Sequence, residues 1–348
     1  MNTFGRFRPF AEQDAKIERP SFAKRFFRAT AYPAFFVISF VFFCYQTFPY
    51  DRLRDYIVDK VSTTGARGPG QDQGYELEIL ELEPYWFSGV ELSGVAIRKR
   101  PATPAERTQA MTFPRIVARV SILPLLLGRA RVGLEAETPT GTIDADVTAG
   151  FDGVVRTVDA EFVDVNLRHL SLAGLAGKVP LKGVFSGTID LDMTSGKANG
   201  RMDLTIRALE LGDGQTRVPI PGTLLAGGLT LEIIRVGTLQ LTTQFTDGVG
   251  RVERLSSRGA DLELRGIGDI RIDRDPRLAR LDLFLQAKFT DAFRNKSDRT
   301  RSMFQLMEMN GRIRQAKASD GSWQFRLRGS PSGQMIPTPA GSERFPAR

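Results

Sequence analysis

The 348-residue sequence predicts a mainly β protein: a single N-terminal transmembrane helix, then a large curved antiparallel amphipathic β-sheet with a few short helices. Three observations support this fold class. Residues 29–50 carry no charge, most of the remaining chain alternates polar and apolar residues, and Gly, Pro, Asp and Asn punctuate the alternating segments. The apolar content of 41% and the charged content of 25% are typical of a folded protein.

The uncharged stretch 29–50 has the length of a membrane span. A helix of this length extends about 33 Å, and the hydrocarbon core of a bilayer is about 30 Å thick. We expect Pro33 in its first turn and Pro49 at its exit. The predicted membrane anchor consists of Phe35, Phe36, Val37, Ile38, Phe40, Val41, Phe42 and Phe43.

Basic residues before this stretch set the expected orientation. Lys24, Arg25 and Arg28 precede it, so the positive-inside rule keeps the N-terminus cytoplasmic. A cleaved signal peptide is the alternative, but no small-residue cleavage pattern follows the apolar run. We therefore expect a single-pass protein of the cell inner membrane, with its bulk in the periplasm.

The expected organisation has five parts. They are a basic cytoplasmic arm (1–28), the transmembrane helix (29–50), a membrane-proximal segment and linker (51–74), a periplasmic β-rich domain (75–328) and a disordered tail (329–348). Short helices are expected over residues 51–60, 169–177 and within 291–315.

Strands are predicted wherever apolar and polar residues alternate with period two. In the first of them the pattern slips by one residue between Ile79 and Leu82. The sequence GTID occurs at Gly141 and Gly187 and is echoed after Gly266, which suggests a meander that grows by repeated hairpins. A hairpin turn is expected at 195–200. The predicted strands cover residues 76–83, 89–98, 141–147, 187–193, 201–207, 229–233, 238–245, 260–273, 280–289 and 323–329.

Strands of this kind have one apolar and one polar face, so the apolar face must be covered by curling of the sheet or by a second layer. Whether that face is a closed core or an open lipid groove is left undecided by the pattern. The candidate apolar face consists of Phe185, Ile189, Leu191, Met193, Leu204, Ile206, Leu262 and Leu264.

Residues able to carry out catalysis are scarce. The chain has one histidine, His169, and one cysteine, Cys44, which excludes an intramolecular disulfide and a cysteine-based zinc site. Asp190 and Asp192 lie two apart, as a hydrolase pair could, but any solvated strand face shows this spacing. We expect no enzyme activity, no cofactor and no metal.

The net charge of +8 is concentrated at the ends of the chain. Residues 1–28 sum to +4 and residues 288–348 to +7, which leaves −3 for the middle. A nucleic-acid-binding domain would place its basic residues on the folded body, so nucleic acid is not an expected partner.

Three segments together resemble a known family: the anchor with FPYDRLRDYI directly after it, residues 118–147, and residues 172–214. Their order of strand, turn and Pro-x-x-Gly resembles the type II secretion system protein N (general secretion pathway protein N) family, with features similar to AsmA-like envelope proteins. The resemblance implies a non-enzymatic inner-membrane component that assembles with, or supports, other secretion-system subunits. An AsmA-like lipid-handling or lipid-transfer role is the alternative, with lipids as partners.

Overall fold

The computed structural model describes residues 22–64, 75–99, 110–168, 179–215, 217–218, 229–230, 232–272, 278–330, 335–343 and 345. The chain divides into two compact units, Met1–Pro49 and Tyr50–Arg348. The predicted helix at 169–177 lies outside the described residues.

The first unit contains one long helix, α1 (Phe22–Thr47). Its segment Thr30–Thr47 is long and apolar enough to cross a membrane, and none of that segment is buried within the protein. The helix begins seven residues before the expected start, so Pro33 lies in its interior and not in its first turn. A proline is tolerated inside a membrane helix because neighbouring groups can satisfy the freed carbonyl.

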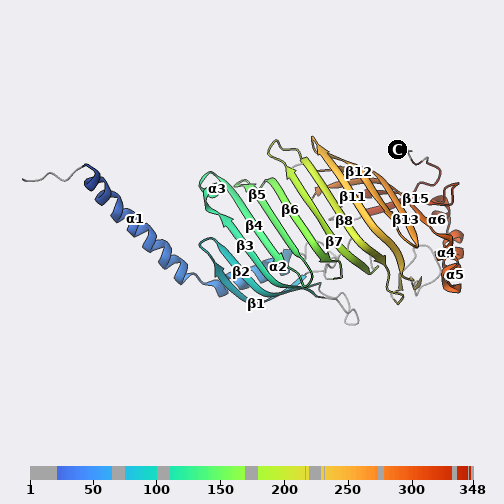
Figure 1. Cartoon of the computed structure of the whole chain (residues 1–348), viewed down its shortest axis with the longest axis horizontal. Helices are drawn as coiled ribbons and strands as arrows, with labels where there is room; N and C mark the ends of the chain where they lie inside the picture. The colour runs from blue at the N-terminus through green and yellow to red at the C-terminus, as the bar shows by residue number, and fades with distance from the viewer. Residues whose placement is uncertain are drawn as a thin grey trace, which may run out of the picture. The chain divides into compact units, whose positions relative to one another are not determined.

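The second unit is built on one antiparallel sheet of 14 strands, which follow one another in sheet order as they do in the chain (Figure 1). The strands are β1 (Tyr75–Tyr85), β2 (Gly89–Lys99), β3 (Met111–Ser121), β4 (Arg129–Glu137), β5 (Thr142–Gly150), β6 (Val155–Asn166), β7 (Leu181–Asp192), β8 (Asn199–Leu211), β11 (Ile234–Thr246), β12 (Val249–Arg258), β13 (Leu262–Arg271), β14 (Arg280–Phe289), β15 (Trp323–Gly329) and β16 (Met335–Pro339).

The sheet confirms the predicted fold class and most of the predicted strands. The expected hairpin turn at 195–200 forms between β7 and β8, but it spans residues 193–198. The predicted strand at 229–233 is shorter than expected: β10 (Leu229–Thr230) pairs only with β9 (Arg217–Val218), in a separate two-stranded sheet. The predicted strand ranges do not include β3, β4, β6, β9, β12 and β16.

The predicted slip in β1 corresponds to one irregular row of the sheet. Ile79 pairs with Val95 and Leu82 with Leu92, so the apolar positions change phase between them. Gly94, at the centre of this row, has φ 61°, and a Cβ there would lie 2.4 Å from Cδ1 of Leu80. Only glycine adopts this conformation without cost, and its missing side chain leaves room for Leu80.

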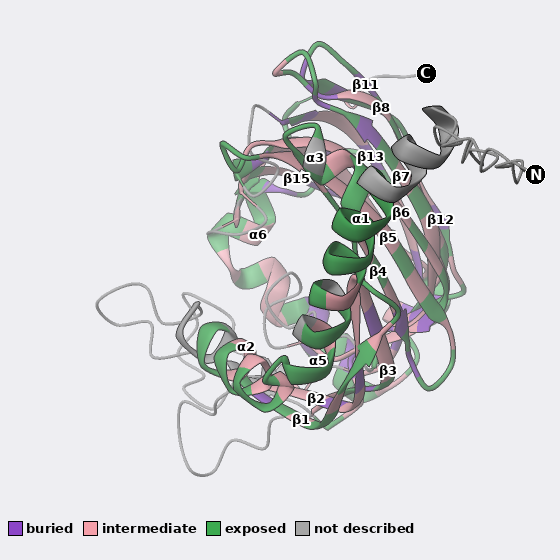
Figure 2. Ribbon diagram, turned by 90° about the vertical axis from the view of Figure 1, so that its left-hand side faces the viewer, coloured by how far each residue is buried: buried purple, intermediate pink, exposed green. Residues whose placement is uncertain are grey.

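Helices cover one face of the sheet at both ends. At the N-terminal end, Ile57 and Val58 of α2 (Tyr50–Thr64) pack against the cluster around Leu77, Leu92 and Phe113. At the C-terminal end the cover consists of α4 (Asp291–Arg294), α5 (Asp298–Met309) and α6 (Gly311–Gln315). Figure 2 shows the sheet curving, with α2, α5 and α6 on its concave side.

The covering helix α5 begins with a capping box. The Ser297 hydroxyl accepts from the backbone N–H of Thr300, whose own hydroxyl accepts from the Ser297 N–H. Its Phe304 stacks on Trp323 of β15 with 5.7 Å between ring centroids. The helix predicted within 291–315 therefore forms as three short helices over the end of the sheet.

Two expected boundaries differ in the structure. Residues 51–74 were expected to be separate from the β-rich domain, but α2 packs on β1 and belongs to the same compact unit. The expected disordered tail 329–348 contains β16, which pairs with β15. Pro337 and Pro339 are compatible with this strand because an edge strand needs hydrogen bonds along one side only.

Candidate functional site

The concave face of the sheet carries a continuous row of apolar side chains. Directly paired residues of an antiparallel sheet lie on the same face, so the strand register identifies each row. One row runs through Val90, Ala118, Leu134, Ala145, Ala160, Ile189 and Met202. A neighbouring row runs through Leu92, Ile116, Ala136, Ile143, Phe162, Gly187, Leu204 and Leu241. We call this surface the apolar face.

The register places all eight predicted face residues on or beside the apolar face. Phe185 pairs with Ile206, Gly187 with Leu204, and Leu264 with Ala287. Leu191, Met193 and Leu262 are buried, and the other five are half-buried. Met193 lies just beyond the end of β7, in the turn.

The apolar face is covered unequally along the sheet. Phe185, Ile206 and Leu262 belong to the cluster under α4–α6, and Ile189, Leu191 and Met193 to a second cluster at the opposite ends of the strands. Nearer the N-terminal end of the sheet, Val120, Val132 and Leu134 on β3 and β4 remain 36%, 38% and 38% exposed. We call this stretch, over β3–β6, the open section.

Sequence reasoning missed the open section because β4 and β6 were not read as separate strands of the face. The signal was present in β6, where Val158, Ala160 and Phe162 alternate with Asp159 and Glu161. The alternation ends at an irregularity after Phe162, where Asp164 adopts φ 52°.

The opposite, polar face is tied together by ion pairs between strands. Arg115 on β3 donates to Glu91 on β2 at 2.7 and 3.1 Å and to Glu137 on β4 at 3.3 Å. The hydrogen bond from Arg115 lowers the pKa of Glu91. At the other end of the sheet, Arg326 donates to Asp282 at 2.9 Å and lowers the pKa of that carboxyl. These pairs fix strand register more than they add stability, since they are exposed.

One row of the polar face is a run of like charges. Asp146 pairs with Asp159, and Asp159 with Asp190, across three neighbouring strands. Partial desolvation, together with the charges of Asp190 and Asp146, raises the pKa of Asp159. Asp146 is neutralised by Arg131, which donates to it with two bonds of 3.2 Å.

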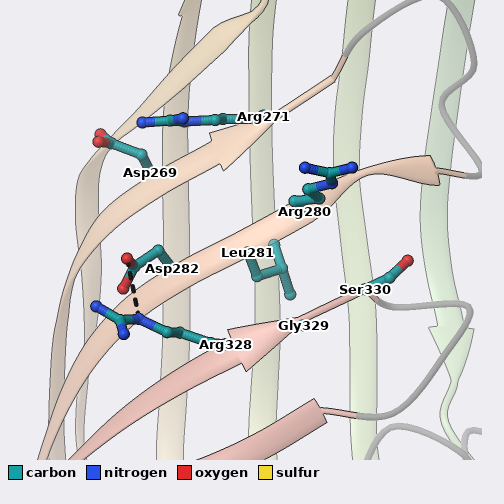
Figure 3. A pocket seen from close by; sticks show the side chains of 8 residues that line it. All are labelled: Asp269, Arg271, Arg280, Leu281, Asp282, Arg328, Gly329 and Ser330. Atoms are coloured by element: carbon teal, nitrogen blue, oxygen red, sulfur yellow. Dashed lines mark hydrogen bonds and ion pairs between the residues drawn. The ribbon is translucent and has the colours of Figure 1, made fainter.

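A polar pocket of about 480 Å³ lies at one end of β13–β15 (Figure 3). Its lining includes Arg271 and Arg280, which face each other in register, and Arg328, which donates to Asp282 at 3.2 Å. The remaining lining residues are Asp269, Leu281, Gly329 and Ser330. The pocket lies on other strands than β3–β6, so it is distinct from the open section.

The predicted anchor residues lie on α1. Phe35, Phe36 and Ile38 are each more than two-thirds exposed, and Val37, Phe40, Phe42 and Phe43 are exposed as well. Val41 lies in the same helix. An uninterrupted apolar surface of this kind is what a lipid-embedded helix presents.

Among the described residues, no group of three or more His, Cys, Asp or Glu side chains is placed to hold a metal ion. Asp190 and Asp192 are both exposed on the polar face, and His169 lies outside the described residues.

No family model matches the sequence, and no match was found among curated proteins or solved structures.

Proposed function

We propose that this protein is a membrane-anchored, non-enzymatic lipid-handling protein that shelters acyl chains on the apolar face of its curved sheet. The observation that carries the proposal is the open section, where two neighbouring apolar rows, one with Val120 and Val132 and one with Leu134, stay more than a third exposed at these side chains.

The chemistry of the open section suits a hydrocarbon chain. Its row combines Leu134 with the small side chains of Ala118, Ala145 and Ala160, which leave a shallow surface without hydrogen-bonding groups. Covering such a surface is favourable by about 25 cal/mol per Å² of apolar area removed from water.

The dimensions of the sheet also suit an elongated ligand. Fourteen strands spaced by about 4.8 Å give a row about 60 Å long. The rows cross the strands, so a chain lying along a row would contact several hairpins in succession. The candidate membrane span of α1 would hold this surface near a source of lipid.

The test is lipid retention by the full-length protein. After purification in mild detergent, native mass spectrometry and lipid extraction should detect bound acyl lipid, and a photoactivatable fatty-acyl probe should crosslink to β3–β6. Leu134→Gln should lower crosslinking several-fold, because it places an amide in the apolar row.

Glu135→Gln is the matched control, since the adjacent residue lies on the polar face and should leave crosslinking unchanged. Equal crosslinking of the two variants, or a wild-type protein without bound lipid, would overturn the proposal.

A second candidate is the secretion-system role implied by the resemblance: an inner-membrane protein with its bulk in the periplasm, assembling with other subunits. The supporting observation is that β1 and β16 form the two edges of the sheet, since an edge strand can accept a strand from a partner. Deleting the gene should then reduce secretion of folded enzymes. Unchanged secretion and unchanged assembly of the machine would exclude this role.

A further inference from the structure

The turns of the first three hairpins expose large apolar side chains at the same end of the sheet. In an antiparallel meander, alternate turns lie at the same end of the sheet. The turns of the hairpins β1–β2, β3–β4 and β5–β6 therefore lie side by side, and they consist of residues 86–88, 122–128 and 151–154 respectively. Seven of their side chains are 40% to 80% exposed: Trp86, Phe87, Ile122, Leu123, Leu125, Leu127 and Phe151. We call these turns the apolar tips.

The three tips are joined to one another. The backbone N–H of Val120, at the end of β3, donates to the carbonyl of Ser88 in the first tip at 2.9 Å. Gly150, directly before Phe151, pairs with Arg129 at the start of β4. The apolar tips therefore form one continuous surface and not three separate projections.

The backbone of the first tip is held in an unusual conformation. Trp86 has φ 51°, in the left-handed region that bulky residues rarely adopt. Its indole is nevertheless 72% exposed, so this conformation gains no burial within the protein. Such backbone strain concentrates where a side chain is presented to a ligand or surface.

The later turns at this end of the sheet differ in character. The β7–β8 turn exposes Thr194, Ser195 and Lys197, and the β11–β12 turn exposes Asp247. Among the described residues at this end, Val249 at the start of β12 and Leu278 before β14 are exposed apolar exceptions. The exposed apolar side chains are thus concentrated in the three hairpins that follow the N-terminal helix most closely in the sequence.

We propose that the apolar tips insert into the interfacial region of the membrane that holds α1. Trp and Phe favour that region, and exposed Arg129, which forms no ion pair with a described residue, lies next to the tips as a partner for anionic headgroups. Only Phe48 and Pro49 separate α1 from α2, and α2 packs on β1, so a short connection tethers the sheet to the candidate membrane span. The proposal does not depend on whether the apolar face holds lipid.

Tryptophan fluorescence of the full-length protein tests the insertion, because the chain has only two tryptophans. Trp323 is 2% exposed in the core, whereas Trp86 is at the tip. In nanodiscs of phosphatidylethanolamine and phosphatidylglycerol, acyl chains brominated near the headgroup should quench the Trp86 emission at least two-fold. Trp86→Phe should abolish the quenching while leaving the Trp323 emission.

In the control, the substitution Lys197→Trp in the Trp86→Phe background moves the tryptophan probe to a polar turn. The emission of this tryptophan should not be quenched by bromolipid and should be quenched by iodide. The double variant Leu123→Ser, Leu127→Ser should reduce the quenching of Trp86, since both leucines are at least 76% exposed and the fold does not require them. Trp86 emission that is unaffected by bromolipid and quenched by iodide would overturn the proposal, as would equal quenching at position 197. Either result would assign the tips to a protein partner or a second copy.

Discussion

At the scale of single residues, neighbouring positions along one strand have opposite roles. Ile189 packs on the apolar face, whereas Asp190 is exposed on the polar face. The alternation in β7 was sufficient to predict this assignment from the sequence, because a half-buried strand must alternate.

Ile189→Asp should lower the free energy of unfolding by about 3 kcal/mol, because it places an unpaired carboxylate among apolar side chains. Asp190→Asn should change it by less than about 0.5 kcal/mol, as is usual for surface substitutions. Chemical denaturation of the full-length protein measures both, and equal effects would show that the face assignment is wrong.

Asp159→Asn should stabilise the protein at neutral pH by about 0.2–1 kcal/mol, because it removes like charges opposite Asp146 and Asp190. The raised pKa of Asp159 gives the pH dependence its sign. The folded state binds this proton more tightly than the unfolded state, so the wild type should gain stability relative to the variant as acidification protonates Asp159. Melting curves from pH 7 to pH 4 measure the difference, and a gap that widens on acidification would contradict the prediction.

At the scale of elements, alternation predicted most of the strands, but not all of them. The unpredicted β12 carries Arg251, Glu253 and Arg254 together, and its apolar-face row includes the buried Ser257. The open section could not be predicted because it depends on where the helices stop covering the sheet, which is a property of tertiary packing.

Gly94→Ala should destabilise the protein by about 1–2 kcal/mol, because a side chain is unfavourable at φ 61° and also meets Leu80. Leu80→Ala alone should have little effect, since Leu80 is 78% exposed. The double variant Gly94→Ala, Leu80→Ala should recover only the part of the lost stability that is due to the contact between the two side chains. Urea denaturation of the three variants measures this coupling, and additive effects would show that the contact is not the cause.

A chain that stops after Ser330 should melt several degrees lower than the full chain. The shortened chain loses β16 and the hydrogen bond of 2.9 Å from the Ala340 N–H to the Gln324 carbonyl. It also loses the contact between the Phe345 and Phe284 rings, whose centroids lie 5.1 Å apart. A chain that stops after Phe345 is the control and should melt like the full chain. Equal melting temperatures for all three would support the disordered tail expected from the sequence.

At the scale of the whole molecule, the C-terminal part of the sheet is better packed than the open section. Two of the three core clusters join residues of β7–β15, whereas β3 and β4 carry Val120, Val132 and Leu134 with more than a third of their surface exposed. Local stability follows the density of buried apolar contacts.

Hydrogen exchange of the full-length protein in nanodiscs should therefore be faster in β4–β6 than in β8–β14. Adding acyl lipid should slow exchange in β3–β6 and leave the C-terminal strands unchanged. Uniform protection from exchange across the sheet would contradict this prediction. Lipid-induced protection confined to α4–α6 would show that lipid binds at the C-terminal end of the sheet.

The order of the strands has a consequence for how the chain folds during synthesis. Each strand pairs with the strand before it in the sheet, so no strand must wait for a distant partner to be synthesised. Contacts between neighbours in sequence keep the loop-closure entropy small at every step. The sheet can therefore grow from its anchored end, one hairpin at a time, with a new edge as the template for the next. The closing of α4–α6 over β8–β13 requires segments far apart in the chain to meet, as do the contacts of β6 and β7 with β13 and β14, so these contacts should form after the strands that they join.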